Sequence, residues 1–277
     1  MKPELSEVLF IKDLYEKSLS DKQLSHGKLD RVDRLTGDAS TRRYYRLYCE
    51  KGHFVVCLDN PIGVGEEYDF LKMQRFLKGH QIRVPEILDF ENEKGYLLEE
   101  DLGDITLLNH LSTSDGLKFE YECYRKCIDE LLKMHSIQKD ELIDINLYFD
   151  YKKLMDEVEF SNKFFVKRFL AVEDENISVR ISQEFVDICK RLSKEKMVYT
   201  HRDYHSRNVM VKNGEFIVID FQDARQGIPQ YDLVSLLEDC YYSISDENKD
   251  SLIKYYWDNL DKCIHGQNDF EYFMSLY

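Results

Sequence analysis

Four polar side chains suited to phosphoryl transfer lie close together near the middle of the C-terminal half. His201, Asp203 and Asn208 fall in the stretch HRDYHSRN, and Asp220 ends the apolar segment that follows. Phosphoryl transfer needs an aligned nucleophile and neutralised phosphate charge more than it needs covalent help from the protein. We therefore expect Asp203 to orient an acceptor hydroxyl as the catalytic base, with His201 bracing the loop beside it. Asn208 and Asp220 would supply the hard oxygen ligands that Mg²⁺ prefers.

Each of these residues also has an ordinary structural interpretation. An aspartate in a loop is commonly a turn residue or a helix cap, and an asparagine before a strand commonly belongs to a turn. The ordered set, with every member on a loop or at a strand end, favours the catalytic interpretation. His135 and His205 lack such a context, so we interpret both as structural or solvated. Asp232 is interpreted as an anchor for the loop or a cap for its own helix.

The elements around this loop are predicted from apolar runs and turn signals. A strand over 197–200 precedes the loop, and a hairpin over 209–211 and 216–219 follows it around Asn213 and Gly214. This arrangement puts the loop at strand ends and carries Asp220 back toward it.

The rest of the chain divides into two regions that differ in predicted secondary structure. The N-terminal region is predicted to begin with a helix from Leu5 and to insert a second helix over 66–78. Its five strands are predicted at 31–35, 43–48, 54–58, 86–90 and 96–99. Residues 100–104 indicate a linker, and the region beyond is predicted to be mostly helical, with late helices over 232–240 and 248–260. The fold class expected is α+β.

The composition is that of a folded, acidic protein. The chain has 277 residues, 43% of them hydrophobic, and its 38 Lys and Arg against 53 Asp and Glu give a net charge of −15. This charge argues against general binding to nucleic acid or to an anionic membrane, because both need a basic surface. The seven cysteines form no C-x-x-C pair and no zinc pattern, which is typical of reduced thiols. With no apolar secretory segment and no membrane-length apolar run, we expect a cytoplasmic monomer.

The loop, the hairpin and Asp220 together resemble the catalytic half of the protein-kinase-like fold. More narrowly, they resemble the superfamily of aminoglycoside phosphotransferases and choline kinases, which departs from the Asp-Phe-Gly of protein kinases as the stretch DFQDAR does here. Within that superfamily the chain is most similar to bacterial N-acetylmuramate/N-acetylglucosamine anomeric kinases. The similarity spans about residues 35–240, and it is carried by GDAS with RRYYR, by YLLEEDLGD, by HRDYHSRN and by YDLVSLL.

The resemblance implies a protein-kinase-like two-lobe fold with a β-rich N-lobe and a mainly helical C-lobe. Residues 1–100 would form the nucleotide-binding lobe, and residues 101–277 the catalytic and substrate lobe. The cofactors implied are ATP and Mg²⁺, with Asp203 as base and Asn208 and Asp220 as metal ligands. The nucleotide would meet a hinge formed by Glu100, Asp101 and Leu102 and a phosphate-covering hairpin formed by Gly37, Asp38, Ala39, Ser40 and Thr41.

The third predicted strand carries no lysine. Protein kinases use a lysine there to meet the α- and β-phosphates, whereas the strand here reads FVVCLD, and the similar sugar kinases also tend to lack it. Because buried phosphate charge is costly when unpaired, we expect another cation in its place. Arg43 is the candidate, since strand alternation would turn Arg42 and Arg46 to the opposite face. The alternative is an ion pair between Arg43 and Glu67 or another neighbouring acid.

Cations surround the expected acceptor position. Arg202 and Arg207 flank the base, and Asp223 and Arg225 follow the metal aspartate. Arginine binds a carboxylate in a bidentate manner, so this set favours an anionic or neutral sugar, unless the arginines pair only with neighbouring acids. The resemblance implies transfer to the anomeric hydroxyl of an N-acetylated amino sugar, with a role in cell-wall recycling. One alternative is an aminoglycoside- or choline-type kinase. The other is a non-catalytic kinase-like binding protein, which the absence of the strand lysine would favour.

Overall fold

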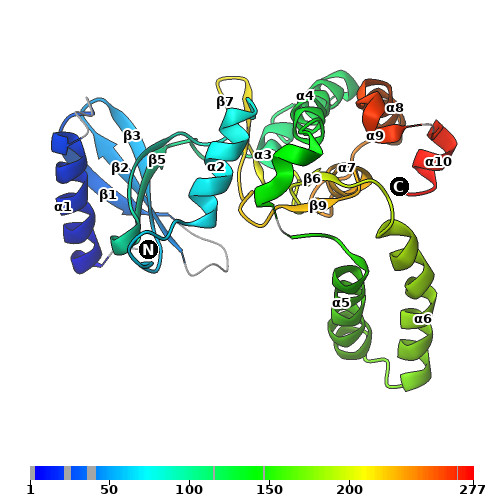
Figure 1. Cartoon of the computed structure of the whole chain (residues 1–277). Coiled ribbons are helices and arrows are strands. Elements are labelled where there is room, and N and C mark those ends of the chain that lie inside the picture. The colour runs from blue at the N-terminus through cyan, green and yellow to red at the C-terminus, as the bar shows by residue number, and fades with distance from the viewer. Residues whose placement is uncertain (1–3, 22–25, 36–41, 115, 146, 267) are drawn as a thin grey trace. The chain divides into compact units, whose positions relative to one another are not determined.

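The structure is a computed structural model of the chain, and it describes residues 4–21, 26–35, 42–114, 116–145, 147–266 and 268–277. The chain divides into two compact units. Unit 1 comprises Met1–Gly79, Arg83–Ile105 and Met210–Gln222, and unit 2 comprises His80–Ile82, Thr106–Val209 and Asp223–Tyr277. Unit 1 contains an antiparallel sheet and unit 2 is mainly helical (Figure 1), which confirms the predicted α+β class.

A sheet of five antiparallel strands forms the centre of unit 1. The strands are β1 (Leu29–Arg34), β2 (Arg43–Cys49), β3 (Gly52–Leu58), β4 (Ile87–Glu91) and β5 (Tyr96–Glu100), and the helices of this unit are α1 (Leu5–Asp21) and α2 (Asp69–Gly79). The spatial order is β1-β2-β3-β5-β4. A 3₁₀ turn over Asn92–Lys94 joins β4 to β5 and ends at Gly95 in the left-handed conformation. A Cβ on Gly95 would lie 2.0 Å from the carbonyl oxygen of Asp59, so this turn requires glycine.

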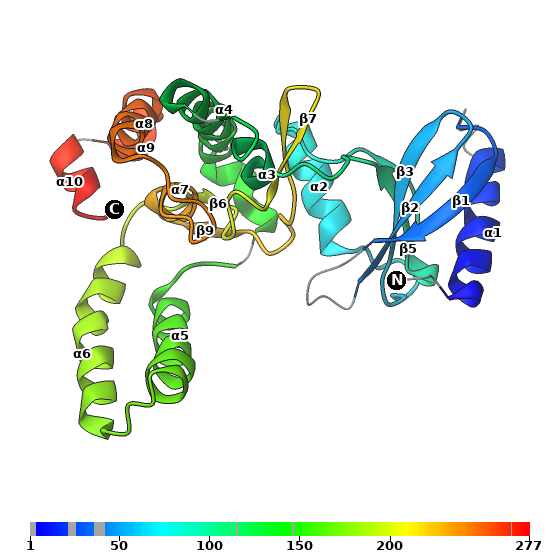
Figure 2. The same cartoon turned by 180° about the vertical axis from the view of Figure 1, so that it is seen from behind.

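The two faces of the sheet are covered differently. On the first, which we call the α1 face, Tyr45 and Val56 pack in a core with residues of α1. On the second, the α2 face, Leu71 of α2 packs against Cys57 and Leu97. Figures 1 and 2 show α1 lying along the first face from both sides of the molecule. Because successive side chains of a strand point to opposite faces, a residue of β2 or β3 that joins one core cannot join the other.

A hairpin from later in the chain belongs to unit 1. Its strands are β7 (Val209–Lys212) and β8 (Glu215–Val218). Asn213 and Gly214 both adopt positive φ at the turn, as expected for the Asn-Gly signal in the sequence. Met210 and Ile217 of the hairpin pack with Leu102, which follows β5. This contact places the segment before Asp220 against the end of the sheet.

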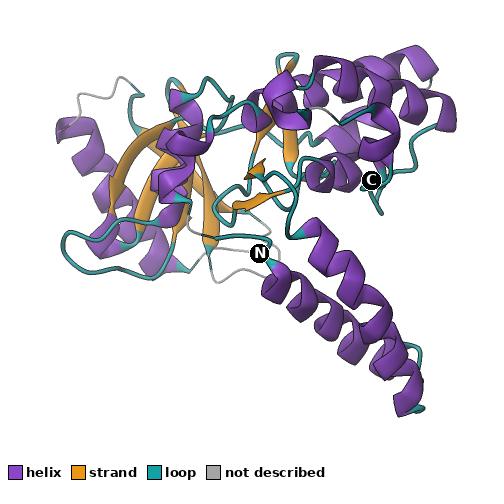
Figure 3. Cartoon of the chain, turned by 45° about the vertical axis from the view of Figure 1, so that its right-hand side comes forward, coloured by secondary structure: helices purple, strands orange, loops and turns teal. Residues whose placement is uncertain are grey.

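Unit 2 is built from helices and one short two-stranded sheet. The helices are α3 (Leu107–Leu111), α4 (Leu117–His135), α5 (Tyr151–Ser161), α6 (Glu175–Leu192), α7 (Gln230–Leu237), α8 (Asp246–Asn259), α9 (Lys262–His265) and α10 (Phe270–Met274), with a 3₁₀ segment over Lys139–Asp144. β6 (Val198–Thr200) pairs antiparallel with β9 (Arg225–Gly227). Figure 3 shows α5 and α6 side by side as a helical pair. Of the helices in the described ranges, none combines the length and apolar character needed to cross a bilayer.

The elements without a sequence prediction include β9 and a π-helix. β9 has the sequence Arg-Gln-Gly, which shows no apolar alternation, and its pairing with β6 depends on Gly227. A Cβ there would lie 2.7 Å from Phe149 and 2.8 Å from Thr200. A π-helix over Asn162–Phe169 continues α5, and a wide helical turn of this kind has no simple sequence signal.

Candidate active site

The stretch from His201 to Asn208 forms a loop in unit 2 that connects β6 to β7, and Asp232 of α7 anchors it. The backbone N–H of His201 donates to Asp232 Oδ2 at 2.6 Å, and the backbone N–H of Arg202 donates to Asp232 Oδ1 at 3.0 Å. Asp232 and His201 have no exposed surface. Hydrogen bonds of this kind to a carboxylate are among the stronger ones in proteins. One buried side chain therefore holds the loop at the two residues that precede Asp203.

Two further buried side chains surround Asp232. His135, at the end of α4, places its Nε2 3.6 Å from Asp232 Oδ2, and its Nδ1 lies 2.6 Å from the hydroxyl of Tyr256 on α8. His135 was predicted to be structural or solvated, and the structure shows it buried and structural. The loop is thus joined to α4, α7 and α8 through one polar network.

The backbone at Arg202 is in a conformation that L-residues rarely adopt. Its φ is 83°, in the left-handed region, and such strain persists only where the surroundings impose it. Here the Asp232 carboxylate holds the Arg202 N–H. The backbone immediately before Asp203 is therefore fixed in the left-handed conformation, and it fixes the position from which the Asp203 side chain extends.

The amide of Asn208 is oriented by the same loop. Its Nδ2 donates to the backbone carbonyl oxygen of Asp203 at 2.9 Å. Because the nitrogen faces the loop, the amide oxygen Oδ1 points the other way, and it is the atom that suits a cation. Lower in the loop, Tyr204 donates its hydroxyl to the Cys127 carbonyl oxygen at 2.8 Å, and the Ser206 N–H donates to Asp239 at 2.9 Å.

Aromatic and cationic side chains of unit 2 lie around Asp203. Tyr231 stacks on Phe149 with ring centres 4.5 Å apart. Burial raises the pKa of Tyr231 to about 12, and the nearby carboxylates of Asp232, Asp203 and Glu157 add to the effect. The phenol ring is therefore within electrostatic range of the Asp203 carboxylate.

The four residues expected around the acceptor have different surroundings. Arg225 lies 5.9 Å from the Phe149 ring centre, and its Nε–H is buried without a hydrogen-bond acceptor among the described residues. Arg202 comes within 4.0 Å of Glu157. Arg207 lies over the ring of Tyr241 at 4.9 Å, and Asp223 is exposed. Arg225 and Arg202 thus share a neighbourhood with Tyr231, whereas Arg207 is directed to Tyr241.

Asp220 belongs to unit 1, where it follows β8. Its φ is 64°, again left-handed, and the side-chain amide of Gln222 donates to its Oδ1 at 2.8 Å. Phe221 is fully buried and stacks on Phe70 of α2 with ring centres 5.0 Å apart. The buried ring secures the chain at a point where the preceding carboxylate is turned outward by a strained backbone.

The expected hinge residues are tied to the hairpin and to β2. Glu100 accepts hydrogen bonds from Arg83 and Lys212, each at 2.8 Å. Burial alone would raise the pKa of Glu100, but these two cations lower it to about 2. The Asp101 carboxylate accepts hydrogen bonds from Arg46 Nη2 at 3.0 Å and from the Gly103 N–H at 2.9 Å. Leu102 is buried against the hairpin. The segment therefore contacts β2 through Asp101 and the β7–β8 hairpin through Glu100 and Leu102.

The phosphate-contacting residues expected from the sequence have mixed outcomes. Gly37, Asp38, Ala39, Ser40 and Thr41 lie outside the described residues. Arg43 is on the α1 face, where its Nε lies 2.8 Å from Glu7 of α1. The expectation that Arg43 faces the nucleotide therefore needs correction, because α1 covers that side of the sheet. Alternation does hold, since Arg42 and Arg46 point to the other face.

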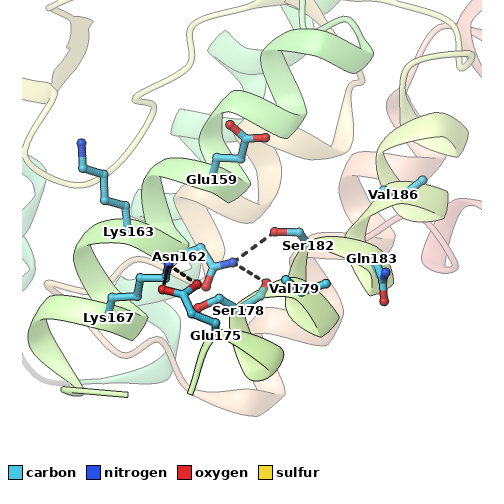
Figure 4. A pocket seen from close by; sticks show the side chains of 10 residues that line it. All are labelled: Glu159, Asn162, Lys163, Lys167, Glu175, Ser178, Val179, Ser182, Gln183 and Val186. Carbon is cyan, nitrogen blue, oxygen red and sulfur yellow. Dashed lines mark hydrogen bonds and ion pairs between the residues drawn. The ribbon is translucent and has the colours of Figure 1, made fainter. Parts of the chain in front are cut away.

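A groove on the pair of helices α5 and α6 has no counterpart in the sequence predictions. Figure 4 shows Asn162 between the helices, and its Nδ2 donates to the Ser178 carbonyl oxygen at 2.7 Å and to Ser182 Oγ at 3.1 Å. At the rim, Lys167 pairs with Glu175 at 2.7 Å. These polar contacts join the π-helix to α6, and none of the predicted site residues lines the groove.

Comparisons with known proteins identify the family of the chain. The model of the phosphotransferase enzyme family matches residues 31–262. A protein of Neisseria meningitidis serogroup B named N-acetylmuramate/N-acetylglucosamine kinase is 30% identical over 222 residues, which cover 80% of this chain and 65% of that protein. A protein of Pseudomonas aeruginosa with the same name is 30% identical over 223 residues, covering 80% and 64%. The chain thus spans less than two thirds of the length of these relatives.

Solved structures share the fold at lower identity. The ethanolamine kinase of Plasmodium vivax superposes with a TM-score of 0.63 at 17% identity, covering 100% of this chain and 78% of that one. The aminoglycoside phosphotransferase APH(2'')-Ib gives 0.60 at 17% identity and covers 95% and 94%. The choline kinase LicA of Streptococcus pneumoniae gives 0.58 at 16% identity and covers 89% and 80%. These similarities confirm the predicted kinase-like fold.

Proposed function

The chain belongs to the phosphotransferase enzyme family, and we propose that it is a small-molecule kinase. In this proposal it transfers the γ-phosphoryl group of ATP to the anomeric hydroxyl of an N-acetylated amino sugar, N-acetylmuramate or N-acetylglucosamine. The observation that carries the proposal is the loop itself. Asp232 and the left-handed Arg202 hold the backbone that presents Asp203, and the Asn208 amide is hydrogen-bonded to the same segment.

Asp203 is the catalytic base in this mechanism. Its carboxylate accepts a hydrogen bond from the acceptor hydroxyl, aligns the oxygen with the phosphoryl group and takes its proton as the new O–P bond forms. The bond from the γ-phosphorus to the β-γ bridging oxygen breaks, and ADP leaves. His201 supports the base through the backbone, because its N–H is bound by Asp232.

Asn208 and Asp220 fit a magnesium ion chemically. Both offer hard oxygen atoms. The Asn208 amide nitrogen is already engaged by the loop, which leaves the oxygen for a cation, and Gln222 orients the Asp220 carboxylate through Oδ1. When bound, Mg²⁺ supplies charge neutralisation between the phosphates. The contribution of the chain is to hold these two oxygens on backbones constrained by hydrogen bonds and by the buried Phe221.

The nucleotide base is assigned to the segment after β5. Leu102 packs with Met210 and Ile217 in an apolar cluster that suits the flat face of adenine. The backbone of Asp101 and Leu102 is the candidate partner for the polar edge of the base. Residues 37–41 remain our proposal for the phosphate-covering hairpin on the strength of their sequence.

The acceptor is assigned to the side of Asp203 where Tyr231 stacks on Phe149. Aromatic rings present a flat apolar surface on which the C–H face of a sugar can pack. The buried Nε–H of Arg225 needs an acceptor, and a carboxylate or acetamido oxygen would provide one. The names of the bacterial relatives, which share 30% identity with this chain, support an N-acetylated amino sugar. A role in cell-wall recycling would follow from such a substrate.

We propose that the protein acts as a cytoplasmic monomer. Every side chain assigned above comes from one chain, so the mechanism requires no second copy. ATP and Mg²⁺ are supplied in the cytoplasm, where such a reaction would run.

The proposal is tested by measuring ADP release with Mg·ATP and four acceptors in parallel. The acceptors are N-acetylmuramate, N-acetylglucosamine, choline and an aminoglycoside. We expect turnover with one or both amino sugars only. Turnover of the cationic acceptors alone would replace the sugar with an aminoglycoside- or choline-type substrate. Nucleotide binding without turnover of any acceptor would favour a non-catalytic kinase-like protein.

A further inference from the structure

Arg42 lies on the α2 face of the sheet, next to β3, the strand that lacks a lysine. β3 carries Cys57 on this face, and the neighbouring Val56 belongs to the α1 core. Arg42 immediately precedes β2, and Arg43 pairs with Leu58 in the sheet register, so Arg42 lies opposite Asp59 at the same end of β3. Its side chain lines a small pocket together with Cys57 and Glu99. A cation therefore lies on the α2 face beside Cys57 and Asp59 of β3, the strand that lacks a lysine.

The Arg42 guanidinium forms an ion pair with the Asp59 carboxylate. Its Nε donates to Asp59 Oδ2 at 2.9 Å, and the two side chains are 23% and 20% exposed. Burial works against the charged form, but the hydrogen bond to Asp59 and the nearby negative groups together outweigh it and raise the pKa of Arg42. A guanidinium has five N–H donors in a planar fork, so it can keep one carboxylate and still bind a phosphate. Protein kinases use a comparable lysine–glutamate ion pair beside the phosphates.

A second acid on this face does not compete for that charge. Glu99 of β5 is 7% exposed. Burial raises the pKa of Glu99 to about 8, although the charge of Arg42 acts in the opposite direction. The side chain is therefore mostly protonated at neutral pH. Asp59 remains the ion-pair partner of Arg42, and the face keeps its capacity for an incoming anion.

The two neighbouring arginines are less suited to that role. Arg46 is shared between Asp101 and Asp104, at 2.7 and 2.9 Å. Arg43 is turned to the α1 face, where it pairs with Glu7.

We propose that Arg42 binds the nucleotide phosphates in place of the strand lysine, with Asp59 as the acid that orients its guanidinium. The inference rests on the proposed function, because it needs ATP as the donor. It assigns the phosphate contact to Arg42, which the sequence analysis had turned to the opposite face, and withdraws it from Arg43.

Calorimetric binding of Mg·ADP and of adenosine separates the contributions of phosphate and base. We expect Arg42→Ala to weaken Mg·ADP binding by roughly 10- to 100-fold, as is usual for loss of a hydrogen-bonded charge, and to leave adenosine binding within about twofold. Arg42→Lys should recover part of the lost affinity, because the charge returns without the fork. Arg43→Ala is the matched control, and we expect it to lower thermal stability without changing either affinity.

The outcomes distinguish the inference from the function on which it rests. Wild-type protein that binds neither Mg·ADP nor adenosine would overturn the proposed function. Wild-type binding with equal Mg·ADP affinity in Arg42→Ala would overturn only the inference. An equal loss of Mg·ADP and adenosine in Arg42→Ala would also overturn it, since the residue would then support the fold and not the phosphates. Selective loss of Mg·ADP in Arg43→Ala would return the role to Arg43.

Discussion

The His201–Asn208 loop of unit 2 and the α2 face of unit 1 both involve a buried carboxylate, but the two acids have different surroundings. Asp232 accepts two backbone N–H groups, and His135 lies 3.6 Å away. Glu99 is also buried, but burial outweighs the attraction of Arg42 and raises its pKa to about 8. Asp232 therefore uses its carboxylate to hold the loop backbone. At Glu99 burial dominates, and the side chain stays mostly protonated at neutral pH.

This difference suits the proposed tasks of the two regions. The loop must present Asp203 in one geometry during the chemical step, and its anchor is completely enclosed. The α2 face must accept a charged ligand and release it, and its cation is held by a partly exposed ion pair with Asp59. Substitutions in the loop should therefore act mainly on kcat, and substitutions on the sheet face mainly on nucleotide binding or on the pH dependence of stability.

The largest effect is expected at the residue that the loop presents. Asp203→Asn should lower kcat by about 10²–10⁴, the usual scale of general-base assistance. Nucleotide affinity should change by less than about twofold, because the amide occupies the same space. Initial rates with an amino sugar and calorimetry with Mg·ADP give the two quantities. Near-normal turnover would remove Asp203 from the mechanism.

The proposed metal ligands should differ in strength. Asp220→Ala should abolish the gain in nucleotide affinity that Mg²⁺ provides, because it removes the only charged oxygen of the pair. Asn208→Ala should reduce that gain less, since it removes a neutral oxygen. Nucleotide affinity measured with and without Mg²⁺ tests both variants. An undiminished Mg²⁺ effect in Asp220→Ala would contradict the assignment.

The anchor of the loop should combine a loss of stability with a loss of turnover. Asp232→Ala leaves the N–H groups of His201 and Arg202 without their acceptor, at a cost of about 1–3 kcal/mol for each buried group. We expect a lower free energy of unfolding and a kcat reduced by about tenfold, with the KM for ATP unchanged. Asp232→Asn keeps one acceptor oxygen and should be milder in both. A variant that loses stability but keeps kcat would show that the anchor does not position the base.

The effect expected at Glu99 is on stability alone, and it depends on pH. The folded protein holds this proton up to about pH 8, whereas the ordinary value for the carboxyl is 4.5. The folded state therefore binds more protons than the unfolded state in this window, and stability falls as the pH rises through it, by up to about 1.4 kcal/mol per pH unit. Glu99→Gln should remove that slope. Denaturant unfolding of both proteins between pH 5 and pH 8 measures it, and parallel profiles would refute the assignment.

Several features of this fold could be predicted from local patterns. Alternation and turn signals located β2, β3 and β5, and the Asn-Gly pair located the β7–β8 turn. The spacing of His201, Asp203 and Asn208 predicted one loop, and these residues lie in one loop. In each case the signal and the structure involve residues close together in the sequence.

Features that depend on distant residues could not be predicted. Alternation separates Arg43 from Arg42 and Arg46, but only the position of α1 shows which face is covered. The contact between His135 and Asp232 joins residues from α4 and α7 that share no pattern. The raised pKa of Glu99 depends on its burial, in a pocket that residues of α2 also line, and no strand pattern reveals that burial by itself.

Phosphorus NMR of the reaction product tests the central claim most directly. Wild-type protein and Asp203→Asn are incubated with Mg·ATP and N-acetylmuramate or N-acetylglucosamine, and the phosphorus–proton coupling identifies the carbon that carries the phosphate. We predict that wild type forms a phosphate ester coupled to the anomeric proton, and that Asp203→Asn forms almost none in the same time. Phosphate on another hydroxyl, or equal product from both proteins, would contradict the account.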